Sequence, residues 1–437
     1  MKSYLKEYGC ACGKNHIASV DEVVVGSGVI ARVPEFVERY GAKRPFLLAD
    51  KNTWAAAGEK LSQILRSREI EYSAHVYAKT GFKPDEHAVG SALMHFDTRC
   101  DLIIGIGSGV INDIGKILSN TTGRKYIIVA TAPSMDGYAS STSSMELDGV
   151  KVSLNSRCAD VIVGDTDILR QAPLYMLKSG LGDMLAKYIS IGEWRIAHVI
   201  TGEYYCEEVA QLMRGALKRC VDNAAGLLER DAEAVEAVFE GLVIGGLAMT
   251  YAGVSRPASG VEHYFSHIWD MRALEFGLES DLHGIQCAIG TLLAAKLYEQ
   301  VKNVTPQWEQ ANSFVQAFSY EDWSAQLKEF LGSCAGTMIA LEAREGKYSK
   351  DTHKARFQII RDHWEEILQI ISQEIPSYAA MAELMDILQI PQNPEYFGVD
   401  AQCLRQTFRA TKDLRDKYVL SRLAWDLGIL ETLCQNL

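Results

Sequence analysis

The segment from Asp101 to Ser134, DLIIGIGSGVINDIGKILSNTTGRKYIIVATAPS, contains two apolar runs with an amphipathic run between them. DLIIGIG and KYIIVATA are short apolar runs, as expected of strands that are buried on both faces of a sheet. INDIGKILSN, which lies between them, has helical periodicity. The segment therefore predicts a strand, a helix and a second strand that form a parallel βαβ unit.

The same alternation of apolar and amphipathic runs extends on the N-terminal side. From Val20 onwards it continues through VDEVVVGSGVI, VPEFVERYG, PFLLAD, AAAGEKLSQILRSREI and YSAHVYA. Strands that alternate with helices in this way indicate a parallel sheet covered by helices on both faces. We therefore expect residues 1–170 to form an α/β domain with a doubly wound, mostly parallel, Rossmann-like sheet.

The pattern changes after the strand-like run ADVIVGD, near residue 170. From APLYMLKSGLGDMLAK to Leu437 nearly every segment shows helical periodicity. The chain of 437 residues is also longer than the ~250–300 residues at which a single core usually stops growing. We expect a second, all-α domain over residues 171–437, with a small-molecule site in the interdomain cleft.

Composition excludes several classes of protein. The formal net charge is −12, which argues against a nucleic-acid partner, because such binding depends on Lys and Arg at the phosphates. The N-terminal residues lack the apolar core of a signal peptide, and no run of about 18 apolar residues follows. The ten cysteines are scattered and show no disulfide framework. We expect a cytoplasmic protein that does not insert into membranes.

One cysteine-containing segment near the N-terminus has two interpretations. Cys10-Ala-Cys12-Gly-Lys-Asn-His16 resembles half of a zinc ligand set. A closed structural zinc site normally has four protein ligands, however, and no second pair follows nearby. The segment is either part of a metal site or a lead-in before the first strand.

The glycine-rich turn Gly105-Ile-Gly107-Ser108-Gly109 follows a predicted strand and precedes a predicted helix. Backbone amides at such a junction can bind a pyrophosphate, but tight turns need glycine for conformational reasons alone. Asp50 ends the earlier run PFLLAD and could accept a hydrogen bond from an adenosine ribose, or could cap the residues that follow it. A carboxylate at this point would repel a 2′-phosphate, which favours NAD over NADP.

Asp136 stands in TAPSMDGYASSTSS, a polar segment directly after a strand. α/β proteins often place ligand-binding loops at this point. The Asp136 carboxylate could bond a ligand hydroxyl, or could form an Asx turn before Gly137. Further along, Asp148-Gly149 predicts the turn of a β-hairpin.

Three histidines lie close together in the helical half, in the segment SGVEHYFSHIWDMRALEFGLESDLHGIQCAIG. His263 and His267 are four residues apart and share a helix face, while His283 lies on another element. A single histidine in such a segment is commonly a core or surface residue. Three of them, with Asp183 upstream at the start of a helix near the domain boundary, indicate a metal site.

The motifs together resemble a known family. GxGSGxxND, TAPSMDGYASS, GLGDMLAK, SGVEHYFSH and LHGIQCAIGT occur here in an order and spacing similar to those of the iron-containing alcohol dehydrogenase superfamily, and most closely to those of its sn-glycerol-1-phosphate dehydrogenase branch. The resemblance spans roughly residues 20–300. It implies that the α/β domain binds a nicotinamide dinucleotide and that the helical domain binds a metal ion and the substrate.

The resemblance also implies roles for individual residues. Asp183, His263 and His283 correspond to the metal ligands, His267 lies near the substrate, and Asp136 contacts the substrate. Other superfamily members have a further histidine ligand where this chain has Lys187, so the resemblance indicates one divalent ion on three ligands, zinc in preference to nickel or iron. The expected cofactor contacts are Asp50, Gly107, Ser108, Gly109, Val110, Ile111, Thr131, Ala132, Pro133, Ser134 and Ser140.

The implied reaction interconverts dihydroxyacetone phosphate and sn-glycerol 1-phosphate with NAD or NADP, the metal polarising the C2 oxygen. His267 or a water molecule would relay the proton. The alternatives are a glycerol or polyol dehydrogenase, a 3-dehydroquinate synthase-like lyase, and a regulator without catalysis. We expect a homodimer. The cation that holds the substrate phosphate is undecided among Lys151, Arg157, Lys187 and Arg256.

Overall fold

The computed structural model describes residues 7–437, which form two compact units. Unit 1 comprises the chain up to Met184 together with Glu207–Val254, and unit 2 comprises Leu185–Cys206 together with Ser255–Leu437. Each unit therefore contains two separate parts of the chain. The domain boundary that the sequence predicts near residue 170 remains a prediction. Unfolding experiments would show which parts of the chain unfold together.

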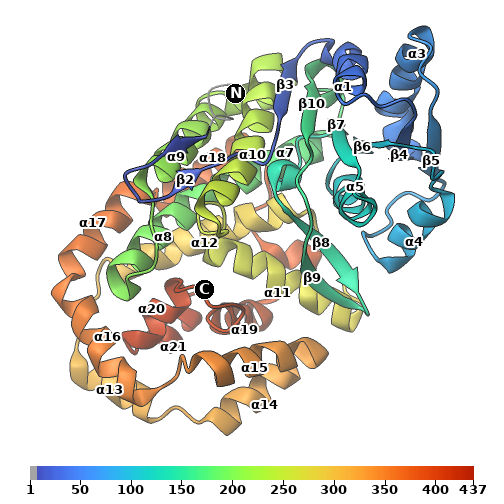
Figure 1. Cartoon of the computed structure of the whole chain (residues 1–437). Helices are drawn as coiled ribbons and strands as arrows, with labels where there is room; N and C mark the ends of the chain where they lie inside the picture. The colour runs from blue at the N-terminus through green and yellow to red at the C-terminus, as the bar shows by residue number, and fades with distance from the viewer. Residues whose placement is uncertain (1–6) are drawn as a thin grey trace. The chain divides into compact units, whose positions relative to one another are not determined.

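Unit 1 is built on a six-stranded sheet with the strand order β3-β10-β7-β6-β4-β5 (Figure 1). Each neighbouring pair in this sheet is parallel. The parallel α/β fold expected from the sequence is therefore confirmed. The strands are β3 (Glu22–Gly26), β4 (Pro45–Asp50), β5 (Ser73–Tyr77), β6 (Leu102–Gly107), β7 (Lys125–Ala130) and β10 (Val161–Asp165).

Both faces of this sheet are buried, which explains why its strands are almost continuously apolar. Alternate residues of the inner strands, such as Leu102, Ile104 and Ile106 of β6, share one core with α1 (Val33–Arg39) and α3 (Glu59–Ser67). The residues between them face the other side, where α5 (Gly109–Thr122) packs against β6 and β7.

The remaining elements of unit 1 surround the sheet. A hairpin joins β8 (Thr142–Leu147) to β9 (Val150–Asn155), and its turn residues Asp148 and Gly149 both have positive φ, at 52° and 75°. The hairpin turn predicted at these residues is confirmed. The other elements are β1 (Tyr8–Gly9), β2 (Asn15–His16), η2 (Val29–Arg32), α2 (Lys51–Thr53), η3 (Trp54–Gly58), α4 (Glu86–His95), η4 (Gly137–Ala139), α6 (Thr166–Leu169), α7 (Leu174–Leu185), α9 (Glu207–Asp222), η5 (Ala224–Leu227) and α10 (Ala232–Ala252).

The described elements of unit 2 are all helical, as the sequence periodicity predicts. α11 packs against α12 and α19, and α12 packs against α8. Its longer helices are α8 (Lys187–Thr201), α11 (Val261–Phe276), α12 (His283–Val301), α13 (Trp308–Gln316), α14 (Tyr320–Leu331), α15 (Ala335–Glu345), α16 (Lys350–Asp362), α17 (Trp364–Glu374), α18 (Tyr378–Ile387), α19 (Ala401–Thr411), α20 (Leu420–Asp426) and α21 (Leu430–Gln435).

The cysteines and the apolar character of the helices can also be compared with the expectations from the sequence. All ten cysteines lie within residues 7–437 and are free thiols, in agreement with the missing disulfide framework. Among these same residues, no helix combines the length and the apolar character that a membrane span needs.

Candidate active site

The strand order of unit 1 places one crevice at the carboxyl edge of the sheet. β4 connects outward to β5, whereas its neighbour β6 connects in the opposite direction to β7. In open α/β sheets, ligands bind outside the carboxyl ends of two such strands. Asp50 ends β4, and Ser108 and Gly109 directly follow β6. The structure thus brings two of the predicted cofactor segments to the same switch point.

The glycines in and after β6 meet different structural requirements. A Cβ at Gly105 would lie 2.4 Å from the Tyr126 hydroxyl, and so would a Cβ at Gly115 on α5. These two glycines let α5 pack closely on the sheet over the Tyr126 ring. A Cβ at Gly107 would lie 2.5 Å from Cβ of Ile111, so this glycine allows the tight turn into α5. Val110 and Ile111 lie in the first turn of α5, and a helix N-terminus favours an anion.

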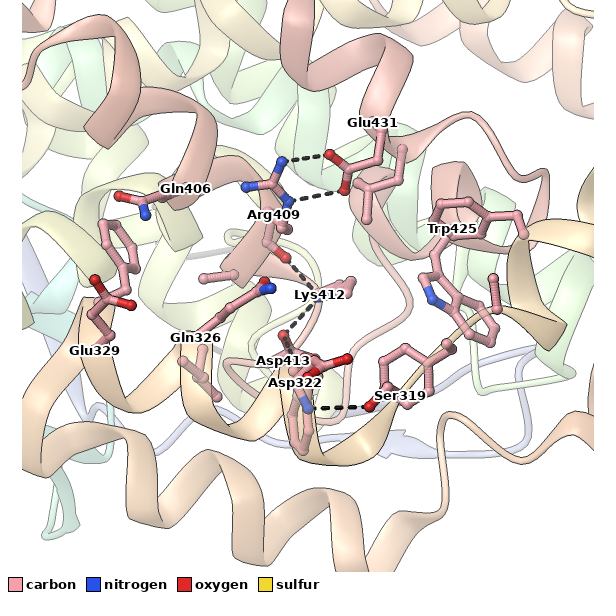
Figure 2. Close-up of a pocket in the computed structure, with 18 residues that line it drawn as sticks. Ser319, Asp322, Gln326, Glu329, Gln406, Arg409, Lys412, Asp413, Trp425 and Glu431 are labelled. Carbon is pink, nitrogen blue, oxygen red and sulfur yellow. Dashed lines mark hydrogen bonds and ion pairs between the residues drawn. The ribbon is translucent and has the colours of Figure 1, made fainter.

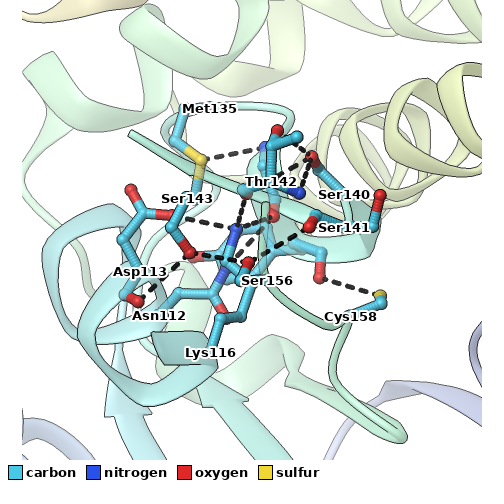
Figure 3. Close-up of polar contacts among 12 residues, drawn as sticks. Asn112, Asp113, Lys116, Met135, Ser140, Ser141, Thr142, Ser143, Ser156 and Cys158 are labelled. Atoms are coloured by element: carbon cyan, nitrogen blue, oxygen red, sulfur yellow. Dashed lines mark hydrogen bonds and ion pairs between the residues drawn. The ribbon is translucent and has the colours of Figure 1, made fainter. Parts of the chain in front are cut away.

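A buried lysine that sequence analysis missed ties α5 to the loop after β7 (Figure 3). Lys116 is fully buried, forms an ion pair with Asp113 at 2.9 Å, and donates to the Gly137 carbonyl at 3.3 Å. Burial raises the pKa of Asp113, and Lys116 only partly opposes this rise. Asn112 donates to the same Gly137 carbonyl at 3.1 Å. The segment that follows Asp136 is therefore held by two side chains of one helix, Asn112 and Lys116.

The other predicted cofactor residues of unit 1 are engaged in local structure. Asp50 caps the short helix α2 (Lys51–Thr53), since its Oδ1 accepts from the Asn52 and Thr53 amides at 2.7 and 2.8 Å. The Ser140 hydroxyl accepts from the Thr142 amide at 3.1 Å and closes the turn into β8. The capping role considered for Asp50 is thus present, and its contact with a ribose remains a prediction.

The segment Thr131–Ser134 begins next to the glycine-rich turn. The Thr131 amide donates to the Gly107 carbonyl at 3.1 Å. The four residues of this segment are buried. The Ala132 carbonyl accepts from the Tyr138 hydroxyl at 2.6 Å, and the Ser134 carbonyl accepts from the Ser179 hydroxyl at 3.0 Å. The two predicted cofactor segments therefore meet at one edge of the sheet, on a rigid backbone.

Asp136 and Asp183 are neighbours within unit 1. The Asp136 amide donates to Oδ2 of Asp183 at 2.9 Å. Asp183 is fully buried near the end of α7 (Leu174–Leu185), so the expectation that it begins a helix is wrong. The Asp136 side chain makes no capping hydrogen bond to the turn that follows it, so a simple Asx turn is not what the structure contains. Two carboxyl-bearing residues thus meet here, one on a helix and one on a loop.

Glycines on two helices make this contact possible. A Cβ at Gly180 on α7 would lie only 1.9 Å from the Pro133 carbonyl oxygen, and a Cβ at Gly245 on α10 would lie 3.2 Å from Cβ of Asp136. The segment from Pro133 to Asp136 therefore rests directly on both helices. Because backbone packs against backbone, side-chain adjustment cannot absorb a larger residue at Gly180.

The three histidines of unit 2 come together as predicted. His263 and His267 lie on α11, and His283 is the first residue of α12. The ring centroids of His263 and His283 are 5.1 Å apart, and those of His267 and His283 are 5.8 Å apart. His263 is buried, whereas the other two are partly exposed.

Hydrogen bonds orient two of these rings in the form that binds a metal. Nδ1 of His263 donates to Glu262 at 2.8 Å. The Ser266 hydroxyl donates to Gln286 at 2.7 Å, so at 3.0 Å its oxygen accepts from Nδ1 of His283. With both protons on Nδ1, both Nε2 atoms carry a lone pair, which is the usual arrangement of metal-bound histidines.

Cys287 is a site residue that sequence analysis missed. Its Sγ lies 3.6 Å from Nε2 of His283, and it forms with His263 and His283 a group of ligand atoms that all lie within 4.8 Å of one another. Burial alone would raise the pKa of this thiol, but the two imidazoles outweigh burial and lower it. The four-residue spacing in His-Gly-Ile-Gln-Cys was the signal that could have identified it.

A buried glutamate fixes the start of α11. Glu193 on α8 accepts from the Val261 amide at 2.9 Å, from the Leu420 amide at 2.7 Å and from the Tyr298 hydroxyl at 3.1 Å. Burial, together with the charge of Glu262, raises the pKa of Glu193 to about 8. The first turn of α11, the helix that carries two of the three histidines, is thus tied through Glu193 to α8, α12 and α20.

The four cations considered for a substrate phosphate differ in their surroundings. Lys151 lies on the strand β9. Arg157 bonds to the Asp160 carboxylate at 3.0 Å, Lys187 to the Ala258 carbonyl at 3.1 Å, and Arg256 to the Glu203 carboxylate at 2.6 Å. Lys187 in particular supports the loop before α11.

Unit 2 also contains a cavity of about 500 Å³ between its later helices (Figure 2). Ion pairs of Arg409 with Glu431 and of Lys412 with Asp413 lie in its wall. None of the site residues predicted from the sequence lines this cavity.

Comparisons with known proteins agree with these features. The family model described as iron-containing alcohol dehydrogenase matches residues 24–173. The chain is 33% identical to a glycerol-1-phosphate dehydrogenase [NAD(P)+] of Halalkalibacterium halodurans over 294 residues, which are 66% of this chain and 74% of that protein. It is 26% identical to a protein of the same name from Bacillus licheniformis, over 98% of this chain and 95% of that one.

Solved structures share the fold. Glycerol dehydrogenase from Schizosaccharomyces pombe superimposes with a TM-score of 0.62 at 17% identity, over 95% of this chain and 90% of that one. Sulfoacetaldehyde reductase from Bifidobacterium kashiwanohense in complex with NAD+ gives a TM-score of 0.62 at 13% identity, over 96% and 98%. The chain therefore belongs to the glycerol-1-phosphate dehydrogenase family of the iron-containing alcohol dehydrogenases.

Proposed function

We propose that this chain is a metal-dependent oxidoreductase that interconverts dihydroxyacetone phosphate and sn-glycerol 1-phosphate with NAD or NADP. The names of its relatives support the reaction. The observation that carries the proposal is the orientation of His263 and His283, whose Nδ1 atoms are engaged and whose Nε2 atoms carry lone pairs. This orientation is the one found in metal-bound histidines, and it fits a divalent ion at these two rings.

The proposed metal ligands are Asp183, His263 and His283. One carboxylate and two imidazoles suit a divalent ion with an open position for substrate. Zinc is preferred to nickel or iron, and the nearby Cys287 thiol supports this preference because thiolates favour zinc. Such an ion supplies Lewis-acid chemistry at the C2 oxygen of the substrate.

Two further residues of the chain are proposed to deliver a proton and to orient the substrate. A bound nicotinamide cofactor would supply the hydride for C2 of dihydroxyacetone phosphate, and the C2 oxygen would need a proton. His267, partly exposed on α11 beside His283, is proposed to deliver that proton, because an imidazole can give and take a proton near neutral pH. Asp136 is proposed to orient a substrate hydroxyl from a loop that α5 holds in place.

The proposed cofactor site is the switch point of unit 1. The first turn of α5 would bind the pyrophosphate, with the segment Thr131–Ser134 and Ser140 beside it. Asp50 would face the adenosine ribose. The proposed cytoplasmic location and homodimer await fractionation and light-scattering measurements.

Substrate preference tests the proposed reaction. The purified chain, loaded in turn with zinc, nickel and iron, is assayed with NADH on dihydroxyacetone phosphate and on dihydroxyacetone. We expect kcat/KM to favour the phosphorylated substrate by about 100-fold, or about 2.7 kcal/mol, as charge-assisted hydrogen bonds to phosphate provide. A preference for the free triose would support the glycerol dehydrogenase alternative. Turnover without net oxidation of NADH would support the lyase.

Cofactor preference depends on the charge of Asp50. Asp50→Asn keeps the Oδ1 acceptor that caps α2 and removes the negative charge. We expect the ratio of kcat/KM for NADPH to that for NADH to rise about tenfold, or about 1.4 kcal/mol. The thermal midpoint should remain close to that of the parent chain. An unchanged ratio would place the adenosine ribose elsewhere.

Metal affinity depends on the hydroxyl that orients His283. Ser266→Ala removes the acceptor of the His283 Nδ1 proton. Loss of such a partner weakens metal binding about 10- to 100-fold, which competition with a metal chelator measures. Thr291→Ala is the matched control, because it removes a buried hydroxyl of α12 that bonds to the Cys287 carbonyl. Equal metal affinity in both variants would contradict the role of Ser266.

A further inference from the structure

We propose that the N-terminal hairpin of unit 1 binds a second metal ion, a zinc ion held by Cys10 Sγ, Cys12 Sγ and His16 Nε2. The family model that matches this chain begins at residue 24 and so does not include the hairpin. The site is separate from the proposed reaction, and its role is to stabilise unit 1.

The backbone of the hairpin presents the two thiols from a tight loop. β1 pairs antiparallel with β2, and Tyr8 lies opposite His16. Within the loop the Cys10 amide donates to the Lys14 carbonyl at 3.0 Å, and the Gly13 amide donates back to the Cys10 carbonyl at 3.0 Å. Gly13 has φ of 85°, a left-handed conformation that favours glycine. The loop is thus closed by its own hydrogen bonds.

The ligand atoms lie within reach of one ion. The Sγ atoms of Cys10 and Cys12 and a ring nitrogen of His16 all lie within 4.8 Å of one another. Sγ of Cys12 is 3.6 Å from Nε2 of His16, and Sγ of Cys10 accepts from the Cys12 amide at 3.4 Å. Zinc binds cysteine in its thiolate form.

His16 is oriented from behind as a ligand would be. It is fully buried, and its Nδ1 donates to the Tyr251 carbonyl at 3.1 Å. The Nε2 lone pair therefore faces Cys12, and a backbone carbonyl on the far nitrogen is a usual outer partner of metal-bound histidine. A simple lead-in segment would not require a fully buried imidazole directed at a thiol.

The hairpin is attached to the end of α10. Besides His16, the Lys14 ammonium donates to the Ala252 carbonyl at 2.9 Å, and Ala252 is the last residue of this helix. Gly245 of α10 contacts Asp136, so an ion in the hairpin would stabilise the helix on which that loop rests. Two cysteines and one histidine form a known zinc set with one further position, which water or another side chain can fill.

Cobalt substitution of the full chain tests the proposal. Thiolate ligands give Co²⁺ a charge-transfer band in the near ultraviolet, and the Cys287→Ser background removes the thiol beside the histidine cluster. We expect the band in this background and its loss when Cys10 and Cys12 are both replaced by serine. Cys403→Ser, which alters a partly buried thiol of α19, is the matched control and should keep the band. A Cys287→Ser chain without the band would overturn the proposal, and so would a band that survives the double replacement.

Metal content and stability give an independent readout. Purified in zinc, the parent chain should hold two ions, and the Cys10→Ser/Cys12→Ser chain should hold one. The thermal midpoint of that variant should fall by several degrees, because an ion that binds only the folded state stabilises it, while kcat and KM remain near the parent values. Asp183→Asn should keep the hairpin ion, so loss of the reaction centre and loss of this site remain distinguishable. Equal zinc content in the parent and the double variant would contradict the assignment.

Discussion

Asp183→Asn is expected to lower kcat/KM for dihydroxyacetone phosphate by about 1,000-fold. Lewis-acid catalysis contributes several kcal/mol to such reactions, and each 1.36 kcal/mol corresponds to a factor of ten. Asparagine is nearly the same size and keeps an oxygen that can accept from the Asp136 amide. The variant therefore removes a charge from the proposed metal ligand while it retains the local hydrogen bond. Steady-state kinetics and metal analysis measure the effect.

The Asp183→Asn variant should lose activity but keep its affinity for NADH. Because the cofactor segments lie after β6 and β7, the dissociation constant for NADH should stay within about twofold of the parent value, a change of about 0.4 kcal/mol. Loss of NADH binding together with activity would indicate a general collapse of unit 1. Unchanged activity would exclude Asp183 as a ligand.

Gly180→Ala is expected to have the largest effect on stability among the variants discussed. Its Cβ would lie 1.9 Å from the Pro133 carbonyl oxygen, so α7 and the loop before Asp136 must separate. Overpacking of this kind costs about 2 to 3 kcal/mol in the free energy of unfolding. The shift would also move Asp136 relative to Asp183, and a displacement of about 1 Å in a catalytic site can lower the rate about 100-fold.

Gly215→Ala on α9 is the matched control for this change. Nothing lies within 4 Å of a Cβ at Gly215, which belongs to the same unit and lies inside a helix. Alanine is favoured over glycine there by about 0.5 to 1 kcal/mol, so this variant should be slightly more stable and fully active. Chemical denaturation and kinetics of both variants check the pair. Similar behaviour of the two would contradict the contact between Gly180 and Pro133.

The sheet of unit 1 could be predicted from sequence because its strands carry a simple signal. Runs such as DLIIGIG are apolar on both faces, and helical periodicity separates them. The turn at Asp148 and Gly149 could be predicted for a similar reason, since both residues tolerate positive φ. The convergence of His263 and His267 with His283 followed from helical spacing and a short connection.

Other features depend on contacts between distant parts of the chain. The chain leaves unit 1 after Met184 and returns for Glu207–Val254, but α9 and α10 have the same helical periodicity as the helices of unit 2. From the sequence pattern Lys116 would be an ordinary exposed lysine of a helix. In the structure it is fully buried and donates to a backbone carbonyl. Gly180 is needed because of Pro133, which lies 47 positions earlier in the printed sequence. No local pattern contains this information.

Anomalous diffraction at the absorption edge of the bound metal tests the central claim most directly. The crystals would contain the full chain with the metal found to support activity. We predict one anomalous peak bonded to Asp183, His263 and His283, with ligand distances of about 2.0 to 2.2 Å. An active, metal-loaded chain without anomalous density at these three side chains would contradict the account.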